Sequence, residues 1–567
     1  MKFSEMPYER IEAEDIISKS KSFIERFKTA GDFEGACRVF EEYDVFQRHI
    51  YTTTALAYIR HGINTNDEYY DAEVDYWNET APVAAEYETL WKEALLESPF
   101  KKELSEKYGE IIFINAELEK KAFSPEIISD MQKEAKLVSK YEKLIASAQI
   151  PFEGEVYTLS QLTPFKTSED DKIRHDAWMT EGKWYKDNKD ELDSIYDELT
   201  HLRDKMGNTL GFGGYTGLGY CRMLRNWFNK EDVEKFRANV REYLVPVADK
   251  LRKAQAKRLG FEYPLSYSDM ALEFRSGNPR PSGSADDILD AGQKFYDELS
   301  PETSKFFRMM RENELMDVLS KKGKEGGGYQ EGLYEYKVPF IFANFNGTQG
   351  DVEVVTHEAG HAFEDYLNED RVPCSTICPT LDGAEIHSMS MEFFAWPWAK
   401  EFFGDDTDKY LYSHLASALL FIPYGTMVDH FQHIVYEKPD MTPAERDNEW
   451  RKLTGIYMPW VKLDGEIPFY SEGCAWQRQS HIYSNPFYYI DYCLAQTVSL
   501  EFWAMIREDK DKAWKKYMEY TTQGGSDTVL NMLNKAGLAS PMDPENFKNV
   551  CKKADEFLSS FDLSGIE

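Results

Sequence analysis

The sequence has few cysteines and few basic residues for its length, and both shortages exclude some classes of protein and partner. Seven cysteines are scattered along 567 residues, which favours reduced thiols over a disulfide framework. Lys and Arg total 66 against 100 Asp and Glu, so the formal net charge is −34. Because nucleic-acid binding draws its affinity from Lys and Arg, this balance makes nucleic acid and anionic lipid poor candidate partners.

Long apolar segments are also lacking. The first fifteen residues are acidic and contain no apolar core of the kind that secretory signal peptides need. Nor do we expect any run long enough to cross a bilayer. The sequence therefore predicts a cytoplasmic protein without a membrane partner.

Patterns typical of β-strands are scarce, and the predicted fold is mainly α-helical. Apolar residues recur three and four positions apart over most of residues 12–145. The texture changes near 151–175, where a short hairpin is predicted, so we place a boundary there between an N-terminal helical lobe, 1–160, and a larger domain, 161–567. The best strand candidates are 333–336 and 338–345, and Pro339 favours an edge position for the second.

Several other motifs receive a structural interpretation. The glycine-rich stretch 210–220 has no Gly-Lys-Ser/Thr, so a tight helix connection is favoured over a phosphate loop. Cys374 and Cys378 lie between prolines with no second pair nearby, which argues against a zinc site. Seven histidines are predicted to be structural: His49, His61, His175, His201, His414, His430 and His433.

One motif carries chemistry. In His357-Glu358-Ala-Gly-His361 the two histidines are four residues apart, so on a helix they project from one face and can hold a single metal ion, with zinc expected. Glu358 lies beside that face, where it can take a proton from a bound water. Asp351 is a plausible N-cap for this helix. A chance histidine pair on an amphipathic helix is the weaker alternative.

A catalytic zinc site needs a third protein ligand. A metzincin would have Gly and His three and six residues after His361, but those positions hold Glu364 and Leu367. Glu385 lies far enough along for a loop and a return on a second helix, so it is the predicted third ligand. Glu392, two turns later, shares its face and is expected to orient a ligand imidazole, whereas His387 is given a packing or substrate-contact role.

Hydrogen-bond donors for the peptide carbonyl are predicted in 481–492. His481 precedes a predicted helix on which Tyr488 and Tyr492 lie one turn apart, and such donors can stabilise the negative charge that amide hydrolysis builds on oxygen. Which tyrosine acts stays open. An aromatic core stripe is the structural alternative for Tyr489.

These residues resemble a known family. The motif around His357 together with Glu385-Ile-His-Ser-Met-Ser-Met-Glu392 is similar to the oligoendopeptidase F branch of the thimet oligopeptidase family of zinc peptidases, of gluzincin type. Residues 342–347 and 481–492 match that family too, and the resemblance runs from about 165 to 545. It implies a two-lobed helical shell around a deep channel that admits short unstructured peptides.

The sequence thus predicts a zinc endopeptidase that acts on short peptides and binds one Zn²⁺ ion. His357, His361 and Glu385 are the expected ligands, and Glu358, His481, Tyr488 and Tyr492 the expected catalytic residues. An exo-acting zinc dipeptidase or carboxypeptidase is the alternative among enzymes. A non-catalytic helical peptide-binding protein is the alternative from another class.

Overall fold

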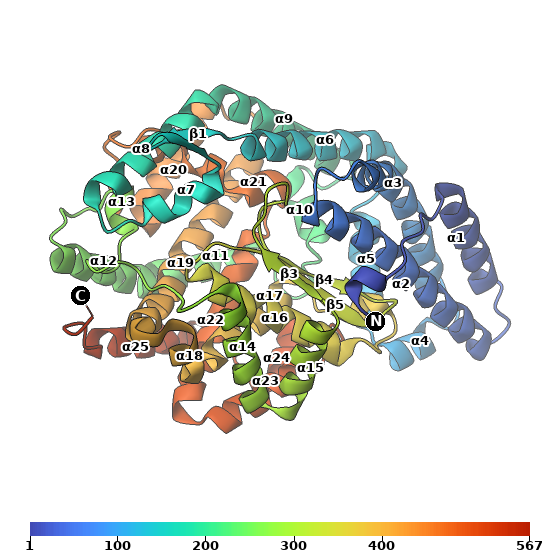
Figure 1. The fold of residues 1–567 in the computed structure, drawn as a ribbon. Helices are drawn as coiled ribbons and strands as arrows, with labels where there is room; N and C mark the ends of the chain where they lie inside the picture. The colour runs from blue at the N-terminus through green and yellow to red at the C-terminus, as the bar shows by residue number, and fades with distance from the viewer. Residues whose placement is uncertain (567) are drawn as a thin grey trace.

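The computed structural model describes residues 1–566, without the side chains of 82 and 83, and it is mainly α-helical as predicted (Figure 1). The N-terminal helices are α1 Ala13–Lys28, α2 Phe33–Ile63, α3 Glu68–Leu96, α4 Lys101–Tyr108, α5 Ile111–Lys121 and α6 Ile128–Ala146. The next group comprises α7 Leu159–Lys166, α8 Asp171–Asp187, α9 Lys189–Thr209, α10 Tyr215–Arg222, α11 Lys230–Asn239, α12 Val245–Leu259, α13 Tyr267–Met270, α14 Ala285–Leu299 and α15 Pro301–Glu312.

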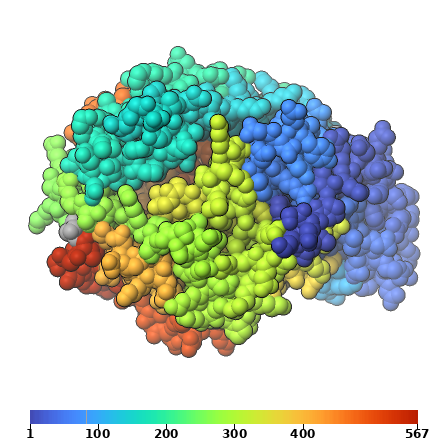
Figure 2. Space-filling model, in the orientation of Figure 1, coloured from blue at the N-terminus to red at the C-terminus, as the bar shows by residue number. Residues whose placement is uncertain are grey.

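The helices that follow the sheet complete the fold. They are α16 Gly350–Asn368, α17 Leu381–Phe394, α18 Ala399–Phe403, α19 Thr407–Glu437, α20 Pro443–Tyr457, α21 Ser480–Ser484, α22 Tyr489–Glu508, α23 Lys510–Thr521, α24 Val529–Lys535 and α25 Pro544–Ser560. In Figure 1, α6, α8 and α9 run along the top, α1–α5 lie to the right, and α14, α15, α23 and α24 lie below the sheet. Figure 2 shows a hollow between the teal upper segment and the yellow-green residues of the sheet region.

Two small sheets account for the strands. The hairpin predicted after residue 150 is formed by β1 Ile150–Phe152 and β2 Glu155–Tyr157. The second sheet has β3 Met316–Leu319, β4 Tyr329–Leu333 and β5 Val338–Phe345 in the order β3-β5-β4. Residues 334–337 form the turn between β4 and β5, so the strand predicted at 333–336 lies earlier in the chain than expected.

Pro339 lies in the central strand β5, so its predicted edge position is wrong. It is opposite Gly332 on β4, and the pairing with β3 begins only at Ile341. Proline cannot donate a backbone hydrogen bond, but at this end of β5 only one neighbouring strand is in register. The missing N–H therefore costs the sheet little.

Asp351 is not the N-cap of α16. The helix begins one residue earlier, with Gln349 at the N-cap position. The Asp351 carboxylate instead accepts hydrogen bonds from the backbone N–H groups of Asn346, at 2.9 Å, and Gly347, at 2.8 Å. It thereby fixes the turn that joins the central strand to the helix carrying the histidine motif.

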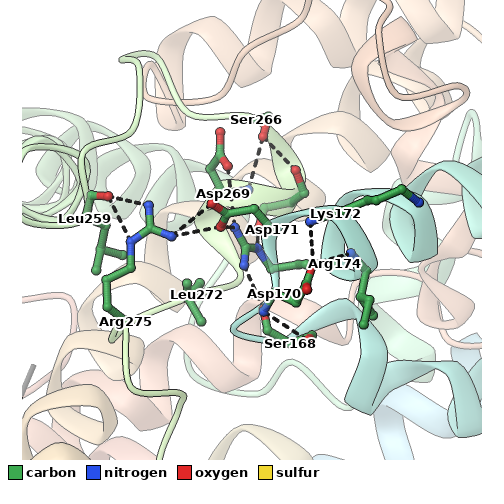
Figure 3. Close-up of polar contacts among 12 residues, drawn as sticks. Ser168, Asp170, Asp171, Lys172, Arg174, Leu259, Ser266, Asp269, Leu272 and Arg275 are labelled. Atoms are coloured by element: carbon green, nitrogen blue, oxygen red, sulfur yellow. Dashed lines mark hydrogen bonds and ion pairs between the residues drawn. The ribbon is translucent and has the colours of Figure 1, made fainter.

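A polar cluster at the start of α8 ties it to the segment between α12 and α14 (Figure 3). The buried Arg174 donates from Nε to the carbonyl oxygen of Ser268, at 2.9 Å, and from a terminal nitrogen to that of Ser168, at 2.7 Å. Asp171 accepts from Arg174 on one side and from Arg275, at 2.8 Å, on the other. These bonds hold the start of α8 against the segment between α12 and α14.

Replacing Arg174 with Met is expected to lower the free energy of unfolding by about 1–3 kcal/mol, because buried carbonyl groups lose their donors. The matched control is Lys172→Met on the same helix, whose exposed ion pair with Asp176 is worth only about 0.3–0.5 kcal/mol. Chemical denaturation of both variants measures the difference. Equal losses would contradict the role given to Arg174.

One stretch, Leu381–Glu437, which spans α17 to α19, contains a window apolar and long enough to pass as a membrane span, with a mean hydropathy of 1.2. The expectation that no such run exists was therefore wrong. However, 72% of this window is buried inside the protein, as is usual for core helices. Burial against other helices explains its composition.

The N-terminal helices have an apolar core of their own. Tyr43 and Trp91 stack within it, with ring centroids 3.9 Å apart. Helix α6, in contrast, packs against α9, and Tyr141 on α6 stacks on Tyr483 at 3.9 Å. The predicted boundary near residue 160 stays a prediction.

Candidate active site

Two helices bring the predicted metal ligands together. His357 and His361 project from one face of α16, and Glu385 faces them from α17. The Glu385 Oε2 atom lies 3.3 Å from His357 Nε2 and 3.4 Å from His361 Nε2. One ligand atom from each of the three residues falls within 4.8 Å of the others.

These separations fit a zinc ion. With bonds of about 2.0–2.2 Å, a tetrahedral zinc site holds its ligand atoms roughly 3.3–3.6 Å apart. The two measured separations to Glu385 fall in that interval. Two imidazoles and one carboxylate are also a donor set that leaves a fourth position open, as catalytic zinc sites do.

Gly360 sets the approach of the two helices. A Cβ atom at this position would meet the Cα atom of Ser388 on α17 at 2.7 Å, which is too close for any real contact. Only glycine therefore permits α17 to pass this near to α16. Since Glu385 lies one turn before Ser388, the crossing also fixes the distance from Glu385 to the histidines.

A hydrogen-bonded chain orients His357. Its Nδ1 contacts Glu392 Oε1 at 2.6 Å, and the other oxygen of Glu392 contacts His414 Nε2 at 2.7 Å. Trp396 donates its indole N–H to His414 Nδ1 at 2.9 Å, so the proton of a neutral His414 is on Nε2 and points at Glu392. With its own Nδ1–H bonded to Glu392, His357 presents the Nε2 lone pair to the ligand position. The contact expected for Glu392 is present.

Both carboxylates at this site stay ionised. Burial alone would raise the pKa of Glu385, but the imidazoles of His361 and His357 outweigh it and hold the pKa well below its usual value. Burial likewise opposes ionisation of Glu392, yet the hydrogen bonds from His357 and His414 lower its pKa to about 2. Glu385 can therefore offer a negative oxygen to a cation at neutral pH.

Glu358 is left available. Its side chain is half-buried, and it makes no hydrogen bond or ion pair with any residue in 1–566. It lies near Tyr492, whose pKa is raised mainly by burial and further by the charges of Glu385 and Glu358. A carboxylate beside the ligand face and without a partner can accept a proton from a reacting molecule there.

The tyrosine segment faces the same site from α22. Tyr488, at the N-cap position and so one residue before the helix, donates its hydroxyl to Glu385 Oε1 at 2.8 Å. Tyr492 lies one turn later, its ring 4.8 Å from that of Tyr488, and its hydroxyl is 3.4 Å from His481 Nε2. Burial raises the pKa of both tyrosines, so both remain protonated.

Gln479 fixes the proton on His481. The Gln479 carbonyl accepts from the Tyr424 hydroxyl at 3.0 Å, so its amide nitrogen faces His481 Nδ1, at 2.9 Å, and donates to it. Burial lowers the pKa of His481, and the imidazole is neutral at pH 7. Its single proton is then on Nε2, directed toward Tyr492 and the ligand site.

Comparison with known proteins places this arrangement in a family. The sequence profile named "Peptidase M3 N-terminal domain" matches residues 3–123, and that named "Peptidase family M3" matches residues 291–549. A solved structure of PZ peptidase A with an inhibitor is 44% identical, covers 99% of this chain and 100% of its own, and superposes with a TM-score of 0.96. The chain belongs to peptidase family M3.

Curated M3 relatives place it in the oligoendopeptidase F branch. The oligoendopeptidase F homolog of Borreliella burgdorferi is 26% identical over 450 residues, which is 74% of this chain and 73% of that protein. Oligopeptidase PepF of Bacillus subtilis is 24% identical over 294 residues, 48% of this chain. The chain spans 43% of the length of that B. subtilis protein.

The backbone before Tyr488 in this M3 chain is held by buried side chains. Phe487 has a φ of 70°, in the left-handed region that non-glycine residues seldom adopt. Its N–H donates to Gln432, at 2.9 Å, and its carbonyl accepts from Arg225, at 2.7 Å. Arg225 also pairs with the buried Asp491 at 2.5 Å. These contacts position the two tyrosines.

The remaining histidines near the core fall into two groups, those that pack inside the protein and one that reaches the ligand site. His387 is buried against Tyr520, with centroids 5.2 Å apart, so of the two roles considered for it only packing is compatible with the structure. Likewise, His430 and His433 contact Tyr457 and Asp429 within the helical core. His414, however, reaches the ligand site through Glu392, and no feature of the sequence around it signals that contact.

A second acidic cluster lies further along α16. Glu364, Asp365 and Cys378 bring their ligand atoms within 4.8 Å of one another. Cys378 donates to Asp365 at 2.6 Å, and Asn368 donates to Glu364 at 3.0 Å. Because these carboxylates already have donors in the protein, they are separate from the ligand set around Glu385.

Proposed function

We propose that this protein is a zinc-dependent endopeptidase that hydrolyses peptide bonds in short unstructured peptides. The observation that carries the proposal is the convergence of His357, His361 and Glu385 at the spacing of a zinc site, with the unpartnered Glu358 beside them. A bound zinc ion supplies Lewis acidity, which activates water and polarises the peptide carbonyl.

Glu358 acts as the general base and then as the general acid. It accepts a proton from the attacking water and passes that proton to the amine that leaves. Its half-buried position, free of protein partners, supports both steps.

His481 and Tyr492 stabilise the oxygen of the tetrahedral intermediate. The neutral His481 directs its Nε2–H into the site, and the Tyr492 hydroxyl lies 3.4 Å from that nitrogen. Tyr488, in contrast, is bonded to Glu385 at 2.8 Å and holds that ligand in orientation. We therefore assign the second oxyanion donor to Tyr492 rather than Tyr488.

The direct test uses peptides blocked at both ends and analysed by mass spectrometry. Cleavage at internal bonds, lost with a chelator and restored by Zn²⁺, is the expected result. Blocked peptides that resist while unblocked ones lose terminal residues would favour the exo-acting alternative. Binding without any cleavage would favour the non-catalytic peptide-binding protein.

Replacing Gln479 with Leu is expected to lower kcat by about 10- to 100-fold, with a smaller effect on KM, because His481 loses the donor that fixes its proton on Nε2. Tyr424→Phe, which removes only the hydroxyl that orients Gln479, should give a smaller loss of the same kind. Steady-state kinetics on one quenched peptide compares the two. A change confined to KM would contradict the positioning role.

We also propose a cytoplasmic location, with no membrane or nucleic-acid partner, and a division into residues 1–160 and 161–567. The net charge of −34 supports the absence of nucleic acid.

A further inference from the structure

Arg478 is a solvent-exposed cation without a carboxylate at ion-pair distance in residues 1–566. It ends a short 3-10 turn, Ala475–Arg478, three residues before His481. Its side chain is exposed to solvent, and no carboxylate within residues 1–566 lies at ion-pair distance from it. Its guanidinium lies over the Tyr470 ring, with 5.9 Å from Cζ to the centroid.

The surroundings of Arg478 are not those of an outer surface. Its charge acts on tyrosines from six different elements, opposing the effect of burial on their pKa values: Tyr141, Tyr185, Tyr267, Tyr424, Tyr470 and Tyr489. Burial also opposes the charge of Arg478 itself, although Tyr470 and Tyr424 outweigh it and raise its pKa. Arg478 is thus exposed to solvent and also lies close enough to six elements for its charge to act on their tyrosines.

The local charge balance is positive. Lys166 is close enough for Arg478 to lower its pKa, after the larger effect of burial, but Lys166 is already paired with Glu181 at 2.6 Å. Glu181 also accepts from the Tyr470 hydroxyl. Two cations thus share one committed carboxylate, in a chain whose net charge is −34. A solvent-exposed guanidinium that no carboxylate of the protein pairs with is available to an anionic ligand.

The segment that carries Arg478 also reaches the candidate active site. Arg478 is next to Gln479, which contacts both Tyr424 and His481. Tyr489, which senses the Arg478 charge, has its ring 5.1 Å from that of His481. A peptide bound with its carbonyl at His481 therefore extends along a surface on which Arg478 is the unpaired cation.

We propose that Arg478 binds a carboxylate of the peptide substrate. A guanidinium can form two parallel hydrogen bonds with a carboxylate, which gives both affinity and a fixed orientation. The carboxylate can come from the C-terminus of the peptide or from an acidic side chain. The inference rests on the proposed peptidase function and names a substrate feature that the zinc site alone does not select.

The test uses the full-length zinc protein and three versions of one quenched peptide: a free acid, a C-terminal amide, and an amide in which one Gln is replaced by Glu. We expect Arg478→Gln to erase a preference of about 10- to 100-fold, mainly in KM, for the free acid or for the Glu peptide over the plain amide. Loss of the first preference identifies the C-terminus, and loss of the second identifies a side chain. Arg478→Lys keeps the charge and should retain part of the preference.

Arg38→Gln is the matched control, because Arg38 is exposed on α2, has no ion pair in the described chain and changes the net charge equally. Its peptide preferences should equal those of the wild type. Zinc content and thermal unfolding verify that each variant is folded.

If wild type cleaves the peptides and Arg478→Gln alters all three equally or none, the inference fails while the peptidase function stands. If wild type cleaves none, the proposed function itself fails, and fluorescence anisotropy of labelled acid and amide peptides then decides the inference: equal affinities for wild type and Arg478→Gln overturn it.

Discussion

Glu358→Gln is expected to reduce kcat by about 10²- to 10⁴-fold and to leave zinc bound. The amide keeps the shape of the side chain but cannot accept the proton of the attacking water. Glu358 makes no hydrogen bond or ion pair with the three ligand residues, so their geometry should persist. Steady-state kinetics together with metal analysis of the purified variant measures both halves of this expectation.

The control for that substitution is Glu302→Gln, an exposed glutamate in the first turn of α15. It alters the net charge by the same amount and should retain wild-type kcat. Substantial peptidase activity in Glu358→Gln, or loss of its zinc, would rule out the role assigned to Glu358.

Glu385→Ala is expected to remove zinc and activity together. It deletes the oxygen that lies 3.3 and 3.4 Å from the two imidazole nitrogens, so affinity for zinc should fall by more than the roughly 10- to 100-fold typical of a lost outer partner. Titration with a competing chelator measures the affinity. Glu392→Gln, which alters the contacts to His357 and His414 but removes no ligand atom, provides the intermediate case.

Full retention of zinc by Glu385→Ala would show that another group is the third ligand. Glu364 and Asp365 are the carboxylates that follow His361 most closely in the sequence, but their hydrogen bonds to Asn368 and Cys378 commit them elsewhere. Double variants in which Glu364 or Asp365 is also replaced would then identify the substitute.

Sequence patterns predicted most of the features that depend only on residues close together in the chain. The helical period and the hairpin after residue 150 are present because each depends on neighbours within a few residues. The helix connection predicted over 210–220 is also present but shorter, since α10 begins at Tyr215. The fold class is therefore as predicted. The spacing of His357 and His361 likewise places both on one face of α16 whatever surrounds that helix.

Features that depend on distant partners could not be predicted in this way. The central position of β5 arises because β3, about twenty residues earlier, adds to its free side, and nothing near Pro339 signals this. His414 lies 22 residues from Glu392, and Gln479 lies 55 residues from Tyr424. A single sequence gives no register between such segments, so contacts of this kind become visible only in three dimensions.

The close approach at Gly360 means that a residue inside the histidine motif also sets the distance between α16 and α17. A methyl group there would push α17 away from α16 and carry Glu385 with it, so ion affinity would fall although every ligand and every proton-transfer group was intact. The glycine thus has no chemical role of its own. By its small size it sets the distance between the two helices, and therefore the size of the cation that their side chains can bind together.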